Sequence, residues 1–225
     1  MTFSIAGRCE KTGEIGVAIT SSSIAVGSRC PWVRAGVGAV ATQNVTDPLL
    51  GNAVLDLLQS GLDPVSALNL VTEDRPHIDH RQLLVVDKHG QTGQYSGGKI
   101  LGCHAVCEGR DAISGGNMLA STLVPSSMVV SFEQNHASSL AHRLIGALEA
   151  GLDLGGEEGD IHSAVLMIAK DHAWPYVDLR VDWHEMAPLQ VLRGLWEAYE
   201  PQAADYAARA VNPDAAPSYG VPGDP

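Results

Sequence analysis

The sequence predicts an α+β domain built as a four-layer αββα sandwich, with two stacked antiparallel sheets between helix layers. The predicted elements come in the order of strands, two helices, strands, one helix, two strands and a last helix. This order lacks the alternation of βαβ units, so we expect antiparallel sheets with the helices outside them. The third strand, residues 36–42 (GVGAVAT), is rich in small residues, which indicates that another layer or a ligand lies close against it.

The chain begins with a predicted β-hairpin. Residues 2–8 (TFSIAGR) and 14–20 (EIGVAIT) alternate in side-chain character, and the polar residues 10–13 between them predict a turn. The alternation gives the first strand two faces, with Phe3, Ile5 and Gly7 on one and Thr2, Ser4 and Ala6 on the other.

Two helices are predicted after the third strand. Asp47 and Asp63 are good N-cap residues, and each precedes a proline that suits the first turn of a helix. Gly61 ends the first helix, and the second runs to Val71. We expect these two helices to pack together in succession.

The second half of the chain returns to strands. We predict strands at 81–87, 94–96, 104–108, 161–170 and 176–181, and helices at 135–150 and 186–199. Residues 111–117 end in the glycine-rich GGN, and the Pro- and Gly-rich residues 212–225 predict an extended or disordered arm. We therefore assign residues 1–211 to one domain.

The composition of the chain argues against several classes of protein, including those that bind nucleic acid or membranes. The 225 residues include 14 Lys plus Arg against 26 Asp plus Glu, a net charge of −12, and no basic cluster, so neither nucleic acid nor an anionic membrane is expected as a partner. The sequence has no apolar run that could span a bilayer, and we expect a cytoplasmic protein. Four cysteines are too few for a disulfide scaffold in a chain of this length.

Thr2 is a candidate nucleophile. It directly follows Met1 and is small enough for the initiator methionine to be removed. A free N-terminal threonine carries a hydroxyl nucleophile and an α-amino base, whose pKa of about 7.7–8.0 suits neutral pH. The same residue also suits an ordinary strand start, so the position alone leaves both interpretations open.

Several distinctive segments lie along the chain, namely TFSI at the start, TGEIGVA in the second strand, AVG followed by PWVRAGVGAVATQ, and later RQLLVVD, GGNML and VDLRVDWH. These segments resemble the family known as domain of unknown function 1028. Together they extend from Thr2 to about Trp196. That family is similar to N-terminal-nucleophile hydrolases, so the resemblance implies the αββα fold of those enzymes.

The resemblance also implies two catalytic residues. The TFS opening places Thr2 at the nucleophile position, and Asn117 in GGNML is where an oxyanion donor is expected. A turn residue after two glycines is the alternative interpretation of Asn117. The chain departs from the family at SSSIAVG, where a lysine-containing segment is expected, and this leaves Ser21, Ser22 and Ser23 as polar lining.

Other polar residues are weaker candidates for substrate binding. Arg34 suits a bidentate contact to a substrate carboxylate or an internal ion pair. Asp79 and Arg81 suit a substrate contact or a solvated loop. The alternating residues Asp178, Arg180, Asp182 and His184 fit a polar pocket wall or a salt-bridged edge strand.

We expect neither a metal nor a cofactor. Cys103, His104 and Cys107 lack a second ligand pair at zinc-finger spacing. The Gly115-Gly116 pair does not match a phosphate-binding loop.

Two function classes follow from the sequence. The first is an N-terminal-nucleophile hydrolase that cleaves a C–N amide-type bond in a small-molecule substrate, and the second is a non-catalytic small-molecule-binding or oligomeric scaffold protein of the same fold. A homodimer is expected because the last helix carries more apolar residues than one small core needs, namely Leu189, Leu192, Leu195 and Trp196.

Overall fold

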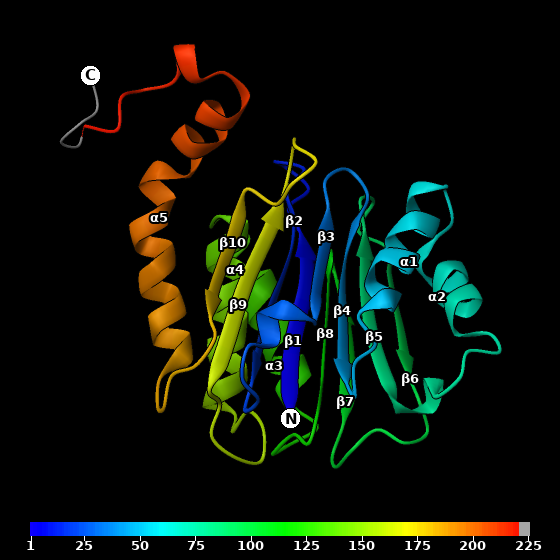
Figure 1. Ribbon diagram of the computed structural model, residues 1–225. Coiled ribbons are helices and arrows are strands. Elements are labelled where there is room, and N and C mark those ends of the chain that lie inside the picture. Colours follow the sequence, from blue (N-terminus) through cyan, green and yellow to red (C-terminus); the bar gives the residue numbers. More distant parts are fainter. Residues whose placement is uncertain (221–225) are drawn as a thin grey trace.

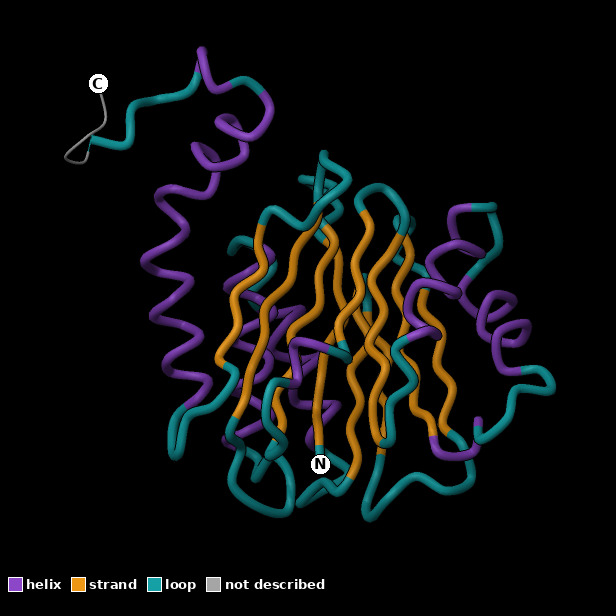
Figure 2. Tube along the Cα trace, viewed as in Figure 1, coloured by secondary structure: helices purple, strands orange, loops and turns teal. Residues whose placement is uncertain are grey.

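The computed structural model describes residues 1–220, and Figures 1 and 2 show its two sheets with helices on both sides. The first sheet has the strand order β10 (Val177–Val181), β9 (Ser163–Ala169), β2 (Ile15–Ser21), β1 (Thr2–Arg8), β8 (Ala112–Asn117) and β7 (Ala105–Gly109). The second sheet has the order β3 (Pro31–Arg34), β4 (Gly38–Asn44), β5 (Arg81–Asp87) and β6 (Thr92–Ser96). Every pairing of these strands is antiparallel.

Four layers follow from where the apolar side chains lie. Helices α3 (Val124–Gln134) and α4 (Leu140–Asp153) cover the first sheet, and α1 (Leu49–Gln59) and α2 (Pro64–Thr72) cover the second. A third apolar cluster lies between the sheets, where Val17 and Ile19 of β2 meet Ala39 and Ala41 of β4. The predicted αββα sandwich is therefore confirmed.

The N-terminal hairpin forms as predicted. In the β1–β2 register, Phe3 lies opposite Thr20 and Arg8 opposite Ile15. Phe3 belongs to the core under the helices, whereas the Ser4 hydroxyl donates a 2.6 Å hydrogen bond to Gln43 of the second sheet. The two predicted faces of β1 are thus buried against different layers.

The predicted helix start at Asp63 is confirmed, whereas α1 begins at Leu49 with Pro48, not Asp47, at the N-cap position. The Asp63 carboxylate accepts hydrogen bonds from the backbone N–H groups of Val65 and Ser66, each at 3.0 Å. Asp47 accepts from the N–H of Leu49 at 3.0 Å. Both carboxylates thereby satisfy N–H groups that the first turn of a helix leaves without partners.

Residues 112–117 form the strand β8, so Gly115 and Gly116 lie in a sheet rather than in the turn considered for GGN. A Cβ atom added at Gly116 would lie 2.6 Å from a Leu119 methyl carbon, and one at Gly115 would lie 3.1 Å from the Ala105 carbonyl oxygen. Close approach of neighbouring atoms therefore requires the two glycines.

Two other predicted boundaries were shifted, and two elements were not predicted. The strand expected at 36–42 is β4 at Gly38–Asn44, and the short β3 before it was not predicted. The helix expected at 135–150 is α4, preceded by the unpredicted α3. α3 carries its apolar stripe (Val124, Met128, Val129 and Phe132) within a serine-rich segment, which hides the helical period.

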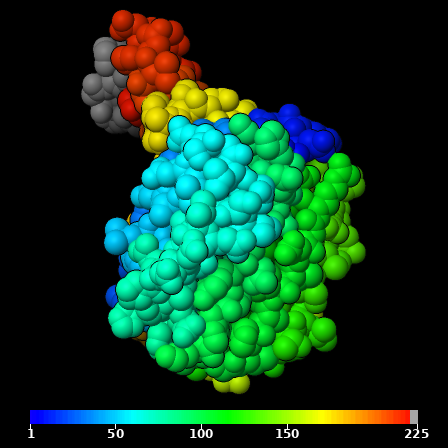
Figure 3. All heavy atoms as spheres, turned by 90° about the vertical axis from the view of Figure 1, so that its right-hand side faces the viewer, coloured from blue at the N-terminus to red at the C-terminus, as the bar shows by residue number. Residues whose placement is uncertain are grey.

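The last helix, α5 (Pro188–Val211), runs well beyond the predicted 186–199, and its end stands away from the body (Figures 1 and 3). Leu189, Leu192 and Trp196 are buried in the chain's own core, with 2%, 0% and 3% exposure. These three residues therefore add no apolar surface, and of the four named for the homodimer only Leu195 is exposed, at 37%. The homodimer stays a prediction. In the predicted arm, Pro213–Ala215 form a short 3-10 helix, and residues 221–225 lie outside the described residues.

Within residues 1–220, no helix has the length and apolar character needed to cross a membrane.

We predict that Gly51→Ala in α1 destabilises the protein, although alanine favours an isolated helix by roughly 1 kcal/mol. A Cβ at Gly51 would lie 2.1 Å from the Trp32 ring, and such overpacking costs about 1–3 kcal/mol. Gly194→Ala in α5 is the matched control, because an added Cβ there meets nothing within 4 Å, and it should stabilise slightly. Urea unfolding of both variants measures the difference. Equal effects at the two positions would contradict the close contact between α1 and β3.

Candidate functional site

A row of polar side chains crosses four adjacent strands where β1 begins. Thr2 lies opposite Asn117 of β8, and Ser21 of β2 lies opposite Ser163 of β9. The Thr2 and Ser21 hydroxyl oxygens are 3.2 Å apart. Because side chains alternate along a strand, all four residues point to the same side as Ser4, towards the second sheet. The row is buried, with Thr2 6% exposed and the other three 0%.

The Thr2 hydroxyl belongs to a chain of hydrogen bonds. Thr2 Oγ1 and Ser21 Oγ each donate to the Met1 carbonyl oxygen at 2.5 Å. Ser21 Oγ lies 2.8 Å from Ser23 Oγ, which accepts a 2.6 Å hydrogen bond from the Arg29 guanidinium. A fixed positive charge therefore stands at the far end of the hydroxyl chain and orients it. In the sequence, Arg29 lies six residues beyond Ser23 and belongs to no distinctive pattern, so it was not predicted as a site residue.

Asn117 is buried with its side-chain amide unused. Neither Oδ1 nor Nδ2 has a hydrogen-bond partner among the described residues. Leaving a buried polar group unsatisfied costs about 1–3 kcal/mol, so packing alone would favour an apolar residue here. The amide can instead donate to a group that enters the row beside Thr2.

Glu157 is a further site residue that the sequence analysis missed. Its side chain is buried, with 4% exposure, and Oε1 accepts a 2.6 Å hydrogen bond from the Ser22 backbone N–H. Oε2 has no partner within residues 1–220. A β-bridge between Leu119 and Glu157 holds this loop next to the end of β8. In the sequence, Glu157 is one acidic residue in the polar run GGEEGD, which is typical of a solvated loop.

The pKa of Glu157 is raised to about 7. Burial is the main cause, and it is partly offset by the positively charged amino group of Met1, the hydrogen bonds from Ser22 and the nearby His162. A carboxyl group with this pKa is shared between its neutral and charged forms at physiological pH. It can therefore hold or release a proton beside the start of β1.

The other predicted substrate-binding residues lie in three places. Ser22 is half-buried and contacts Glu157 through its backbone. Arg81 lies opposite Asn44, at the same end of the sandwich as Thr2, and its guanidinium donates to the Val45 carbonyl. The backbone carbonyl of Asp79 accepts from the Lys99 N–H at 2.9 Å. Asp79 and Arg81 thus border the second sheet near the row, and neither forms a hydrogen bond with Thr2 or Asn117.

Arg34 lies at the opposite end of the sandwich from the row. It pairs with Gly38, six residues along β4 from Asn44, a separation of roughly 20 Å in an extended strand. Its guanidinium donates to Asp56 and Gln59 of α1, both at 2.7 Å. Of the two interpretations of Arg34, the structure shows the ion pair.

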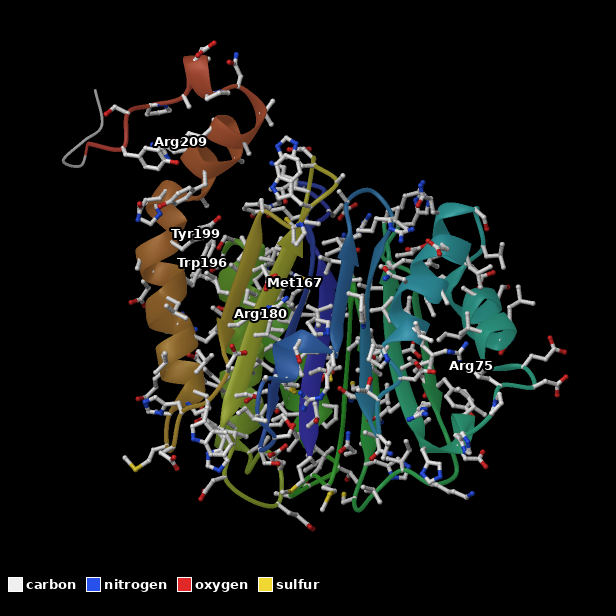
Figure 4. The ribbon with its side chains drawn as sticks, in the orientation of Figure 1. Arg75, Met167, Arg180, Trp196, Tyr199 and Arg209 are labelled. Atoms are coloured by element: carbon white, nitrogen blue, oxygen red, sulfur yellow. The ribbon has the colours of Figure 1, made fainter. Side chains whose placement is uncertain are left out.

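The alternating charges of β10 form a salt-bridged edge. Arg180 Nε lies 2.6 Å from Asp178 Oδ1, and Figure 4 shows Arg180 on this outermost strand of the first sheet. The edge-strand interpretation therefore holds for this pair. Among residues 1–220, no group of three His, Cys, Asp or Glu residues is arranged to hold a metal ion.

Comparison with known proteins identifies relatives by sequence and by fold. The sequence profile of DUF1028, a family of unknown function, matches residues 2–192. A crystal structure of a DUF1028 protein from Silicibacter pomeroyi is similar, with 29% identity, a TM-score of 0.83, and coverage of 92% of this chain and 90% of the other. No protein with curated annotation matches.

Two more distant structures are of Anbu, the ancestral beta-subunit. The one from Yersinia bercovieri has 12% identity, a TM-score of 0.38, and coverage of 91% of this chain and 96% of its own. The Gly-1 mutant from Hyphomicrobium has 11% identity, a TM-score of 0.41, and coverage of 91% and 97%.

We predict that Glu157 makes the stability of the protein depend on pH. Because burial raises its pKa from 4.5 to about 7, the folded state holds the proton more tightly than the unfolded chain. The resulting stabilisation is complete below pH 4.5 and is lost as the pH rises through 7. A tenfold change in proton affinity corresponds to about 1.4 kcal/mol, so the loss amounts to roughly 3 kcal/mol.

Glu157→Gln keeps the acceptor for Ser22 and removes the titration. The free energies of unfolding of the two proteins should therefore diverge between pH 5 and pH 8, with the variant favoured at the higher pH. Urea titrations at several pH values measure this difference. Parallel curves for the two proteins would show that Glu157 does not titrate in this range.

Proposed function

The chain belongs to the DUF1028 family, and on the geometry of its polar row we propose that it is an N-terminal-nucleophile hydrolase that cleaves a C–N amide-type bond in a small molecule. The observation that carries the proposal is the position of Thr2, at the start of a central strand and between the Ser21 hydroxyl and the Asn117 amide. The αββα architecture agrees with the fold that the resemblance to these hydrolases implies.

Removal of Met1 would convert Thr2 into a complete catalytic unit. The Met1 carbonyl that now accepts hydrogen bonds from Thr2 and Ser21 would leave, and the Thr2 nitrogen would become a free α-amino group. This amine is attached to the same residue as the hydroxyl and can take its proton. The space around the departed carbonyl then becomes a place for the carbonyl group of a substrate.

The reaction proceeds in two halves. Thr2 Oγ1 attacks the amide carbon while the α-amino group accepts the hydroxyl proton, and the tetrahedral intermediate collapses as that proton passes to the leaving nitrogen. The C–N bond breaks, and an ester forms between the acyl group and Thr2. The amine then takes a proton from water and the hydroxide attacks the ester. The acyl–oxygen bond breaks as the proton passes from the amine to Thr2 Oγ1, which releases the acid and restores Thr2.

Asn117 and Glu157 act on different groups in this mechanism, Asn117 on the oxyanion and Glu157 on the Thr2 amine. Asn117 Nδ2 has no other acceptor among the described residues and donates to the oxyanion of the tetrahedral intermediate. Glu157 lies close enough to the first amino group of the chain for their charges to interact. After processing, its carboxylate holds the Thr2 amine in position. Ser21 orients the Thr2 hydroxyl.

We predict that Thr2→Ala, with Met1 removed, abolishes hydrolysis yet folds normally, because the nucleophile is deleted while β1 keeps its packing. Thr2→Ser is the matched control and should retain activity, since it keeps the hydroxyl. Small acyl amides, ureido compounds and cyclic amides form the substrate panel for the wild type. Intact mass measurement establishes whether Met1 has been removed from each sample.

An uncleaved N-terminal tag should also abolish activity, because it blocks the amine without touching the hydroxyl. If the blocked protein hydrolysed the same substrate at the rate of the processed protein, another nucleophile would have to be sought among Ser21, Ser22 and Ser23. If the processed wild type turned over nothing in the panel but bound its members, the non-catalytic binding protein would be the better assignment.

We predict that Asn117→Leu lowers kcat about 10²–10³-fold, the usual loss when one oxyanion donor is removed. Leucine is branched at Cγ as asparagine is, so the substitution deletes a buried unsatisfied amide without opening a cavity. The free energy of unfolding should therefore stay the same or rise. Enzyme kinetics and urea unfolding of the same sample check both results. A large loss of stability with unchanged kcat would assign Asn117 a structural role instead.

A further inference from the structure

A second polar site lies at the other end of β1. The turns that follow β1 and β7, the end of α3 and the start of α4 enclose a cavity of about 430 Å³. Residues that line it include Cys9, Lys11, Arg110, Glu133, His136 and Arg143. β1 spans seven residues, so Cys9 lies roughly 20 Å from Thr2. The cavity is therefore separate from the row around Thr2.

Arg143 is a buried cation whose outer nitrogens are unused. The residue is only 7% exposed, and Nε donates a 3.1 Å hydrogen bond to the Phe132 carbonyl oxygen. The guanidinium carbon lies 3.7 Å from the centre of the Phe132 ring, so the group is held flat on the aromatic face. Nη1 and Nη2 make no hydrogen bond or ion pair with any residue in the described part of the chain. Burial lowers the pKa of Arg143, which reflects the loss of solvent around the charge.

The acidic groups around the cavity already have other partners. Asp111 accepts from Arg8 at 2.6 Å and lies 3.7 Å from Arg110. Glu10 pairs with Arg110 at 2.9 Å, and Glu133 Oε1 accepts from the Arg110 backbone N–H at 2.7 Å. Nη1 and Nη2 of Arg143 are therefore available to an anion from outside the chain.

We propose that this cavity binds a small molecule through a single carboxylate group, with Nη1 and Nη2 of Arg143 as a bidentate anchor. The planar guanidinium fork matches the two oxygens of a carboxylate. The carboxylates of Glu10, Asp111 and Glu133 also face this space, so a doubly charged phosphate meets stronger repulsion than a monoanion does. The cavity has the volume of a site for a small organic molecule.

Calorimetric titration of the full chain at pH 7.5 and low salt tests the proposal. The probes are acetate, benzoate and phenylacetate, with benzyl alcohol as a neutral analogue and inorganic phosphate as the competing anion. We expect saturable 1:1 binding of at least one carboxylate and none of benzyl alcohol. Binding of phosphate without binding of any carboxylate, or no binding of any anion, would overturn the proposal.

Variants locate the bound carboxylate. Arg143→Met should weaken its binding at least tenfold, and Arg143→Lys, which keeps the charge but loses the fork, should weaken it less. Arg193→Met is the matched control, because Arg193 of α5 pairs with Glu149 at 2.5 Å and does not line the cavity, so this variant should bind the carboxylate as the wild type does. Wild-type affinity in Arg143→Met would exclude Arg143 as the anchor.

A measurement on the wild type tests the proposal even if the Arg143 variants do not fold. Cys9 lines the cavity, whereas Cys103 lies beside Leu119 near the other end of β8. A saturating concentration of the bound carboxylate should slow alkylation of Cys9 by iodoacetamide several-fold and leave Cys103 unchanged, as read by peptide mass spectrometry. Equal rates at Cys9 with and without the carboxylate would place the binding elsewhere and overturn the proposal.

Discussion

The pairing of β1 between β2 and β8 fixes both the core and the candidate site of this protein. It buries the first strand in the middle of the first sheet, so that Phe3 and Ile5 enter the core beneath α3 and α4 while Ser4 and Ala6 face the second sheet. The same pairing places Thr2 directly beside Asn117. An antiparallel register cannot slip by one residue without moving every side chain of β1 to the wrong face. The position of Thr2 is therefore as well determined as the core itself.

Close packing of the two sheets depends on small residues along their shared face. Ala39 and Ala41 of β4 meet Ala6 of β1, and Gly115 of β8 lies against the Leu84 side chain of β5. Near the start of β1 the shared face turns polar, where Ser4, Gln43 and Gln82 form a hydrogen-bonded group that continues to the Gly116 carbonyl. Buried polar groups are tolerated when they are satisfied by one another. Against this satisfied background, the unused atoms of Asn117 and Glu157 stand out as candidates for function.

The two ends of β1 differ in their chemistry. The end at Thr2 gathers hydroxyl and amide groups with one buried carboxyl, an environment suited to proton transfer and to a developing negative charge. The end at Cys9 gathers full charges, most of them paired, around the guanidinium of Arg143. One strand thus connects a proposed reaction centre with a proposed anion site, and neither depends on the other for its geometry.

Local patterns were enough to determine much of this protein from its sequence. The period-two alternation predicted which side chains of β1 and β2 share a face, and the Asp-Pro pairs predicted where α1 and α2 begin. The order of the elements predicted the four layers. These signals arise between residues that are close together in the chain. α3 was not predicted because serines mask its apolar stripe. β8 was not predicted because its glycines are required by close contacts with Leu84 and Thr2, which are distant in the sequence. The residues of the candidate site show the same difference between local patterns and tertiary contacts. The sequence predicted Thr2, Ser21 and Asn117 as site residues. Only the tertiary structure showed that Glu157 lies beside them and that Arg34 forms an ion pair with Asp56. Burial and charge pairing depend on residues that come into contact only when the sheets have packed.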